Sequence, residues 1–269
     1  MYKLIAIDMD GTLLNSDKKV SKENIATINE AMKRGIRVAI CTGRPYSGIE
    51  PYAKEIGLCK DDEYIISQNG SYVSNGNDTK TISAKYLNVE ETNKILSYLE
   101  DKEIGVVLVT DKDYLAYNCE INEEMKRDAD LVFKTIKMFD KSKDSIENLK
   151  LVKIMIMDNS HKIDNIIENM DKNIINSCYV VRSMPYLIEI MAKNVDKGYG
   201  LSKLAEHLNI DHKDIMVIGD ELNDIGMFKV AGLGVAMANA NIEIKRLADF
   251  ITLSNDENGV SYAIDYFMK

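Results

Sequence analysis

The chain has little of several residue types that mark special classes of protein. It has no tryptophan and only three prolines among 269 residues, and these two absences carry no functional message. Its four cysteines, Cys41, Cys59, Cys119 and Cys178, lie far apart and form no CxxC pair. This spacing indicates neither a zinc site nor a disulfide framework, and we expect reduced, mostly buried thiols.

Excess positive charge and long apolar runs are also missing. The 43 acidic residues outnumber the 34 basic ones, and the net charge of -9 argues against a nucleic-acid partner, which would need a basic surface. No apolar run approaches the roughly 18 residues that a membrane-spanning helix needs, so no membrane partner is expected. The chain opens on a strand pattern rather than a secretion signal, which favours a cytoplasmic protein. Nothing in the composition indicates an oligomeric state.

The first stretch of the chain places two acids at the end of a strand. The apolar, β-branched residues 4–7 predict a buried strand, and Asp8, Met9, Asp10 and Gly11 follow it. Side chains alternate along extended chain, so Asp8 and Asp10 point the same way if the strand geometry continues. Two converging carboxylates favour a hard divalent cation such as magnesium. A plain strand that ends in an Asp-Gly turn is the alternative.

A second strand end brings residues suited to phosphate. Ser21 is a helix N-cap candidate, apolar residues recur at helical spacing up to Gly35, and residues 36–41 predict a strand. Strand, helix and strand in this order indicate a parallel crossover. The new strand ends in Thr42-Gly43-Arg44, which offers a hydroxyl, a backbone amide and a guanidinium. A simple turn before a helix is the alternative.

Residues 63–67 predict a third strand, and Gln68-Asn69-Gly70-Ser71 after it is typical of a hairpin. We favour a structural turn for Asn69, although its side chain can also face the site.

The pattern changes near residue 83, where a different kind of domain begins. We expect an inserted α+β domain with an antiparallel sheet at residues 84–188. Its expected elements are a helix at 89–99, strands at 104–110 and 114–119, a polar stretch without clear pattern at 120–148, a strand at 151–157, a helix around 163–170 and a strand at 178–182.

The parallel pattern then resumes. A helix from Lys197 and a strand at 215–218 lead into Gly219-Asp220-Glu221-Leu222-Asn223-Asp224, so acids again follow a strand. The remaining expected elements are a strand at 233–236, a helix at 242–247, a strand at 250–253 and a polar turn at 255–259. We therefore predict an α/β core, a doubly wound parallel sheet built from residues 1–83 and 189–269.

Lys197 is unusual because it opens a helix, where the macrodipole disfavours a cation. A bound phosphate or the nearby carboxylates would compensate, whereas the alternative is a solvated lysine. Asp220, Glu221 and Asp224 have an equally plain alternative as acids favoured in a first helical turn.

The four motifs together resemble those of the haloacid dehalogenase-like (HAD) phosphohydrolases, specifically the Cof-type hydrolases with a large inserted C2-type cap. In chain order the motifs are Asp8-Met9-Asp10-Gly11-Thr12, Thr42-Gly43-Arg44, Asp196-Lys197-Gly198 and Gly219-Asp220-Glu221-Leu222-Asn223-Asp224. Asn239-Ala240 and Asn258-Gly259-Val260 also resemble the C-terminal pattern of this family.

The resemblance implies phosphoryl transfer to water through an aspartyl phosphate. Asp8 would be the nucleophile, and Asp10 the general acid and base. One Mg2+ would bind Asp8, the backbone carbonyl of Asp10 and Asp220, with Glu221 or Asp224 acting directly or through water.

The resemblance also implies a set of groups for the phosphoryl oxygens. These are the Met9 amide, Thr42, the Gly43 amide, Lys197 and Asn223.

The expected substrate is a small phosphorylated metabolite, such as a sugar phosphate or a flavin or pyridoxal phosphate. The inserted domain should close over the site and contact the leaving group. Candidate specificity residues are Arg44, Asn69 and Arg182, with Tyr117 and Tyr186 as further candidates. Two alternatives stay open: a phosphosugar mutase that uses the same aspartyl phosphate, and a non-catalytic module that binds a phosphorylated metabolite.

Overall fold

The computed structural model describes residues 2–140 and 145–268 and divides into two compact units. Unit 1 comprises Met1–Ala84 and Asp196–Lys269, and unit 2 comprises Lys85–Val195. The observed insertion starts at residue 85 where the sequence suggested 84, and it ends at 195 where the sequence suggested 188. The later end has a clear cause: strand β11 (Leu187–Ala192), which the sequence analysis missed, pairs with two strands of unit 2.

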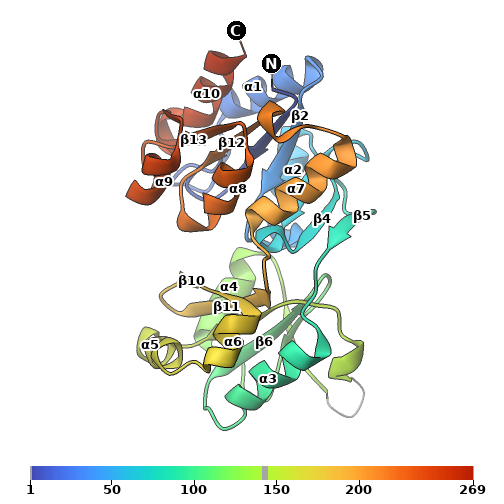
Figure 1. Ribbon diagram of the computed structural model, residues 1–269, viewed down its shortest axis with the longest axis vertical. Coiled ribbons are helices and arrows are strands. Elements are labelled where there is room, and N and C mark those ends of the chain that lie inside the picture. The colour runs from blue at the N-terminus through green and yellow to red at the C-terminus, as the bar shows by residue number, and fades with distance from the viewer. Residues whose placement is uncertain (1, 141–144, 269) are drawn as a thin grey trace. The chain divides into compact units, whose positions relative to one another are not determined.

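Unit 1 is built on an eight-stranded sheet in the order β14-β13-β12-β1-β2-β3-β4-β5 (Figure 1). The six strands from β14 to β3 run parallel, β4 pairs antiparallel with β3, and β5 pairs antiparallel with β4 at the edge of the sheet. This confirms the doubly wound sheet and the hairpin after residue 67. The strands are β1 (Leu4–Ile7), β2 (Arg37–Cys41), β3 (Tyr64–Ser67), β4 (Tyr72–Asn75), β5 (Thr81–Ala84), β12 (Ile215–Gly219), β13 (Leu233–Ala236) and β14 (Phe250–Ile251).

In the described part of unit 1, six α-helices cover this sheet. The chain moves from β1 through β2 to β3 in one direction and from β12 through β13 to β14 in the other, so right-handed crossovers place the two sets of helices on opposite faces. Accordingly α1 packs against α2 and α10, and α8 against α7 and α9. The helices are α1 (Lys22–Lys33), α2 (Glu50–Ile56), α7 (Lys197–Leu208), α8 (Ile225–Val230), α9 (Ile242–Leu247) and α10 (Gly259–Phe267).

Helix α1 shows how the local sequence sets an element. The Ser21 hydroxyl accepts a hydrogen bond from the Asn24 amide at 3.1 Å and so caps the helix, as the sequence predicts. Ile28 and Ala31 face the core. The helix ends just before Gly35, whose φ of +83° favours glycine.

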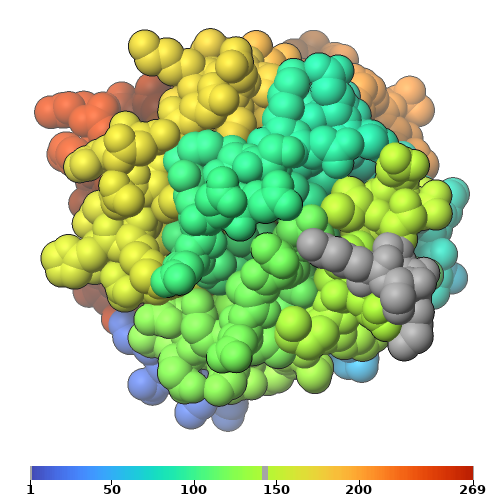
Figure 2. Space-filling view, turned by 90° about the horizontal axis from the view of Figure 1, so that it is seen from below, coloured from blue at the N-terminus to red at the C-terminus, as the bar shows by residue number. Residues whose placement is uncertain are grey.

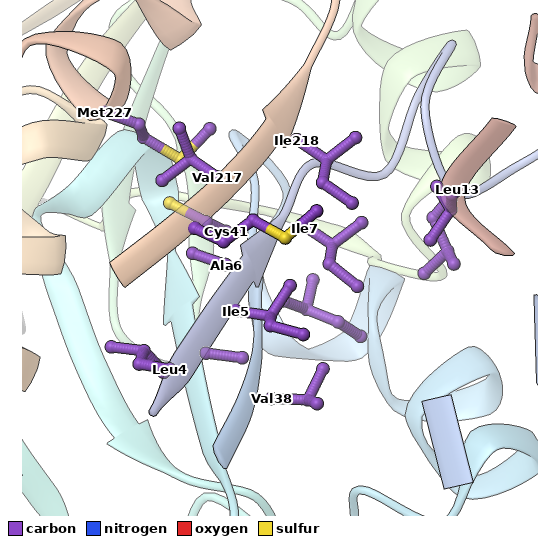
Figure 3. Packing of buried hydrophobic residues seen from close by; sticks show 14 of the residues in the cluster. Leu4, Ile5, Ala6, Ile7, Leu13, Val38, Cys41, Val217, Ile218 and Met227 are labelled. Atoms are coloured by element: carbon purple, nitrogen blue, oxygen red, sulfur yellow. The ribbon is translucent and has the colours of Figure 1, made fainter. Parts of the chain in front are cut away.

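The core of unit 1 is centred on β1. Its four residues are buried on both faces, because helices cover the sheet on each side. Figure 3 shows Ile5 and Ile7 of β1 among Val38, Ile218 and Leu13. A strand buried on both faces explains why this segment reads as a continuous apolar run.

Unit 2 contains a six-stranded sheet in the order β10-β11-β9-β6-β7-β8, and among its described residues the β7–β8 pair is parallel while the other pairs are antiparallel. The inserted α+β domain is thereby confirmed in class. Helices α3 and α6 lie beside each other on the face shown in Figure 2. The further elements are β6 (Gly105–Thr110), β7 (Tyr114–Ala116), β8 (Ile136–Met138), β9 (Leu151–Met157), β10 (Cys178–Met184), α3 (Val89–Leu99), α4 (Glu123–Leu131), α5 (Ser160–Glu168) and α6 (Lys172–Ser177).

The stretch at 120–148, which the sequence left without pattern, contains α4 and β8. Helix α4 is capped by Asn122, whose side chain accepts from the Met125 amide at 2.8 Å. Of its nine residues Met125 and Ala129 are buried, so its apolar stripe is too thin to be seen as a period in the sequence.

The polar turn predicted at 255–259 is a short 3-10 helix, Asn255–Glu257, that leads directly into α10. Helix α10 was not predicted from the sequence, although Val260, Ala263 and Ile264 are buried at helical spacing.

The described residues can be examined for a membrane-spanning helix and for disulfide bonds. Within residues 2–140 and 145–268, no helix combines the length and apolar character needed to cross a bilayer. All four cysteines are free thiols, with Cys41 and Cys178 buried and Cys59 and Cys119 half-buried.

The central position of Ile5 gives a stability prediction. Ile5→Ala removes fully buried methyl groups from β1 and leaves a cavity, so the free energy of unfolding should fall by about 2–5 kcal/mol. Because the chain lacks tryptophan, urea unfolding is best followed by circular dichroism. Ile242→Ala is the matched control, since that side chain is 60% exposed and its loss should change the stability by at most about 0.5 kcal/mol. Equal losses in both variants would contradict the assignment of β1 to the core.

Candidate functional site

The sequence-predicted residues meet where the strand order of unit 1 reverses. Strands β1 and β12 are neighbours, and the chain winds away from them in opposite directions. Asp8 follows β1, Thr42 follows β2 and Asp220 follows β12. Since these strands are parallel, their carboxyl ends share one edge of the sheet, and the crevice at such a switch point is the usual ligand site of doubly wound folds.

Lys197 lies at the centre of this edge and is fully buried. Its Nζ donates to Asp8 Oδ1 at 2.5 Å and to Asp224 Oδ1 at 2.6 Å. Burial alone would lower the pKa of Lys197, but the charges of Asp224 and Asp8 outweigh it and raise that pKa. Nearby carboxylates therefore compensate the cation at the start of α7, and the alternative of a solvated lysine is wrong.

Asp224 is held by three donors. Its Oδ2 accepts the backbone amides of Asp220 at 2.9 Å and Glu221 at 3.0 Å, while Oδ1 accepts Lys197. The strand end also needs glycine at this point, because a Cβ on Gly219 would lie 2.6 Å from Asp224 Oδ2. Asp224 thus fixes both the loop after β12 and the position of the lysine.

Asp220 and Asp8 are buried acids whose charged forms are costly. Burial raises the pKa of Asp220 to about 6, although Thr12 Oγ1 donates to Asp220 Oδ1 at 2.6 Å and favours the anion. Burial likewise raises the pKa of Asp8 well above its usual range, in spite of Lys197 and with the help of the neighbouring Asp224 and Asp220 charges. Both raised pKa values have the same two causes, which are burial away from water and the negative charge of neighbouring carboxylates.

Carboxylate oxygens of Asp8, Asp220 and Asp224 lie within 4.8 Å of one another. Three buried carboxylates face one ammonium group, so the cluster needs further positive charge to be fully ionised. Oxygen donors at this spacing fit a hard divalent cation such as Mg2+. The residues therefore fit the cofactor that the sequence motifs imply.

Asp10 has a different environment from Asp8. The chain turns after β1, because the amides of Thr12 and Leu14 both donate to the Met9 carbonyl, at 3.3 and 2.9 Å. The Asp10 carboxylate accepts two hydrogen bonds from Arg44 and one from Lys18, and 41% of its side-chain surface is exposed. The expectation that both carboxylates enter one cluster is therefore not met among the described residues, where the acidic cluster contains Asp8 and not the Asp10 side chain.

Burial would raise the pKa of Asp10, but the hydrogen bonds and charges of Arg44 and Lys18 outweigh it and lower that pKa. The pKa of Asp8 is therefore raised above the usual range for an aspartate, whereas that of Asp10 is lowered. The opposite shifts show that the turn after β1 places the two carboxylates in different electrostatic environments.

Beside the acidic cluster lies a group of predicted phosphate-binding and specificity residues, namely Thr42, Gly43, Asn69 and Asn223. The Thr42 carbonyl accepts the Asn69 amide at 3.0 Å, and Asn69 Oδ1 accepts Asn223 Nδ2 at 3.2 Å. A Cβ on Gly43 would lie 3.0 Å from Asn69 Oδ1, so the glycine lets these side chains approach. Asn69 is both a turn residue, with φ of +53°, and a neighbour of predicted site residues.

Glu221 and Met9 contribute less to the site than the other predicted residues. The Glu221 carboxylate accepts a hydrogen bond from the backbone amide of Leu222 at 3.2 Å. The acidic cluster contains Asp224 and not Glu221, which separates the two acids that the sequence left as alternatives. The Met9 side chain is fully buried in the core, which leaves only its backbone for the phosphate role.

The specificity candidates of unit 2 make contacts within that unit. Arg182 donates to Asp164 Oδ1 at 2.5 Å and to the Pro185 carbonyl at 2.8 Å. The Tyr117 ring lies 5.5 Å from that of Phe139. The guanidinium of Arg127 lies 5.9 Å from the ring centre of Tyr186.

Three residues of the site went unassigned by sequence reasoning. Thr12 binds Asp220, and its place inside the first motif was an available signal. Asn239 Nδ2 donates to the Gly11 carbonyl at 2.8 Å, and its position shortly after a strand was a weaker signal. Lys18 gave no signal, because it lies in a polar loop and reaches Asp10 only through the fold.

A doubly wound α/β domain with an acidic site at its switch point defines the general class of the protein, and comparisons with known proteins define its family. A family model described as haloacid dehalogenase-like hydrolase matches residues 5–264. YxeH of Bacillus subtilis is 33% identical over 264 residues, which cover 98% of this chain and 97% of that protein. The B. subtilis protein named 5-amino-6-(5-phospho-D-ribitylamino)uracil phosphatase YcsE is 32% identical over 279 residues, 99% of this chain and 96% of that protein.

The structural comparison agrees. A solved haloacid dehalogenase-like hydrolase from Bacteroides thetaiotaomicron has a TM-score of 0.89 and 31% sequence identity, and the match covers 99% of this chain and 100% of that chain. The chain therefore belongs to the haloacid dehalogenase-like hydrolases. This confirms the resemblance found in the four motifs, and the named relatives support phosphatase as the enzyme class.

The pKa of Asp220 gives a pH-dependent stability prediction for the metal-free protein. Its folded pKa of about 6 lies above the usual 3.8, so the stability it contributes is present below the usual value and is lost as the pH rises through about 6. Asp220→Asn carries no such charge. In EDTA the variant should match the wild type near about pH 4 and exceed its free energy of unfolding by up to about 3 kcal/mol above about pH 7.

Unfolding of both proteins by urea at several pH values measures this difference. Asp62→Asn is the control, because the Asp62 side chain is 70% exposed and should show no such trend. A stability difference that stays constant with pH would contradict the burial cost at Asp220.

Proposed function

We propose that the protein is a magnesium-dependent phosphatase that hydrolyses small phosphorylated metabolites through an aspartyl-phosphate intermediate. The observation that carries the proposal is the placement of Asp8, a buried carboxylate that is oriented by Lys197 and lies beside Asp220 and Asp224 at the switch point. An anionic nucleophile needs this kind of positive and metal-binding surrounding before it can approach an anionic phosphate.

The reaction has two steps. In the first, a carboxylate oxygen of Asp8 bonds to phosphorus while the bond from phosphorus to the leaving oxygen breaks, and that oxygen takes a proton from Asp10. In the second, a water oxygen bonds to phosphorus, the bond to Asp8 breaks, and the water proton passes to Asp10. An alcohol and inorganic phosphate leave, and both acids return to their starting states.

Asp8, the Asp10 carbonyl, Asp220 and Asp224 would hold Mg2+, which supplies charge that screens the nucleophile from the phosphate and stabilises the transition state. Lys197 neutralises part of the acidic cluster and keeps the Asp8 carboxylate in a fixed direction.

The phosphoryl oxygens would bind to groups at the same edge of the sheet. Thr42 is at the end of β2, and the amides of Met9 and Gly43 are the backbone donors next to Asp8 and Thr42. Asn223 is held near this place by its bond to Asn69. Hydroxyl, amide and ammonium donors around one phosphoryl group stabilise the charge that develops in transfer.

The substrate class we propose is a sugar phosphate or a similar phosphomonoester. The support is the relative YcsE, whose name gives it a phosphorylated ribityl compound as substrate. A panel of phosphorylated metabolites, with inorganic phosphate as the readout, tests this class. Formation of an isomeric sugar phosphate without phosphate release would show a mutase instead.

Replacement of the nucleophile is the direct test of the mechanism. Asp8→Asn keeps the size of the side chain but removes the charge, so hydrolysis of 4-nitrophenyl phosphate should fall by at least about 10³-fold. The matched control Asp62→Asn changes an exposed acid and should retain full activity. Wild-type activity in Asp8→Asn would exclude the aspartyl phosphate.

Metal removal is an independent test. Exhaustive dialysis against EDTA should abolish hydrolysis of 4-nitrophenyl phosphate, and addition of Mg2+ should restore it, because the buried carboxylates lack enough positive charge without an ion. Activity that survives EDTA would show that the acidic cluster serves another purpose.

A further inference from the structure

The Asp10 carboxylate is held by a two-point contact with a single arginine. Arg44 Nε donates to Asp10 Oδ2 at 2.7 Å and Arg44 Nη2 donates to Asp10 Oδ1 at 2.7 Å. Two parallel bonds between a planar guanidinium and a carboxylate fix the rotation of the carboxylate as well as its position. Lys18 Nζ adds a third bond, to Oδ1 at 2.9 Å.

Arg44 is itself held in place. Its Nη1 donates to the Gly48 carbonyl at 3.1 Å, and its guanidinium lies 5.6 Å from the ring centre of Tyr52. Its backbone is bound at both ends, since its amide donates to Thr42 Oγ1 at 3.3 Å and its carbonyl accepts the Gln68 amide at 3.0 Å. The side chain is 12% exposed, so it has little freedom to move.

Lys18 reaches Asp10 from a tightly built loop. Its φ of +57° is a left-handed conformation that a lysine seldom adopts. The loop is closed by Asn15, which bonds to the backbone of Lys18 and Lys19 through its carbonyl, amide and side chain. The backbone thus holds a strained conformation at the residue whose ammonium meets Asp10.

We propose that Arg44 is a positioning residue that aims the Asp10 carboxylate, with Lys18 as a second support, and that it does not select the substrate. Three of the five guanidinium N–H groups donate to Asp10 or Gly48, and the side chain is 12% exposed, which together favour a role toward Asp10 over the specificity role that the sequence suggested for Arg44. The inference rests on the proposed function, because it assigns a purpose to the acid and base of that mechanism.

Leaving groups of different basicity separate this role from others. 4-Nitrophenolate departs without a proton. Phenolate is as basic as a tyrosine side chain, with a pKa of about 10, so its departure is helped by a proton. Both substrates share the phenyl ring, so binding contacts largely cancel. kcat/KM reports the first step, in which the leaving oxygen takes the proton of Asp10.

For Arg44→Ala we expect kcat/KM for phenyl phosphate to fall about tenfold or more and that for 4-nitrophenyl phosphate about threefold or less, since general acid catalysis is worth about 10²–10⁴-fold. Arg44→Lys keeps the charge but loses the two-point contact, so it should recover part of the phenyl phosphate activity. Arg37→Ala is the matched control, an arginine at the other end of β2 that donates to the Asp62 carbonyl.

A double-mutant cycle with Asp10→Asn tests whether Arg44 acts through Asp10. In the Asp10→Asn background, Arg44→Ala should change neither rate further, whereas an independent role would reduce the rates again. Equal losses for both substrates, or additive effects in the cycle, would overturn the proposal. The circular dichroism spectrum of each variant should match that of the wild type, which shows that the fold is retained. The milder Arg44→Lys provides a second variant in case Arg44→Ala does not fold.

The outcome for the proposed function is separate. If the wild type hydrolyses neither substrate, or Asp8→Asn hydrolyses both, the proposed function fails. If the wild type is active, Asp8→Asn is inactive and Arg44→Ala treats both substrates alike, only the role of Arg44 fails.

Discussion

The buried contact of Lys197 with Asp8 and Asp224 is the constraint on which the rest of the site depends. It joins the first strand, the start of α7 and the loop after β12, which are far apart in the sequence. A buried ammonium is tolerated only when carboxylates surround it, and a buried carboxylate likewise needs a cation. Each of the three residues therefore makes the burial of the other two acceptable. The excess of acid that remains is what suits the place to a divalent cation.

The same short segment gives its two acids opposite surroundings. Asp8 is deep, faces Lys197 and has a raised pKa, whereas Asp10 is partly exposed, lies between Arg44 and Lys18 and has a lowered pKa. The turn after β1 causes the difference, because it redirects the chain within two residues. One strand end thus places two carboxylates in different electrostatic environments.

Much of the fold could be predicted from local sequence. The strands β1, β9 and β13 and the helices α3 and α9 have the bounds that their apolar patterns suggested, since each buries a face with a regular period. Helix α4 and strand β11 escaped notice. Few residues of α4 are buried, and β11 is a short buried run, interrupted by Glu189, in a segment that sequence reasoning had assigned to the domain boundary. The boundary itself depended on a strand pairing, which has no local signal.

The sequence by itself determined the fold class through its periodicity and the family through its four motifs, and those motifs predicted Asp8, Lys197, Asp220 and Asp224 as site residues. Only the tertiary structure decided how these residues pair. It showed that Lys197 is buried against two carboxylates, that Asp224 and not Glu221 joins the acidic cluster, and that Arg44 and Lys18 bind Asp10. The reason is physical. A side chain's partner depends on where the backbone brings distant segments together, and neither composition nor spacing carries that information.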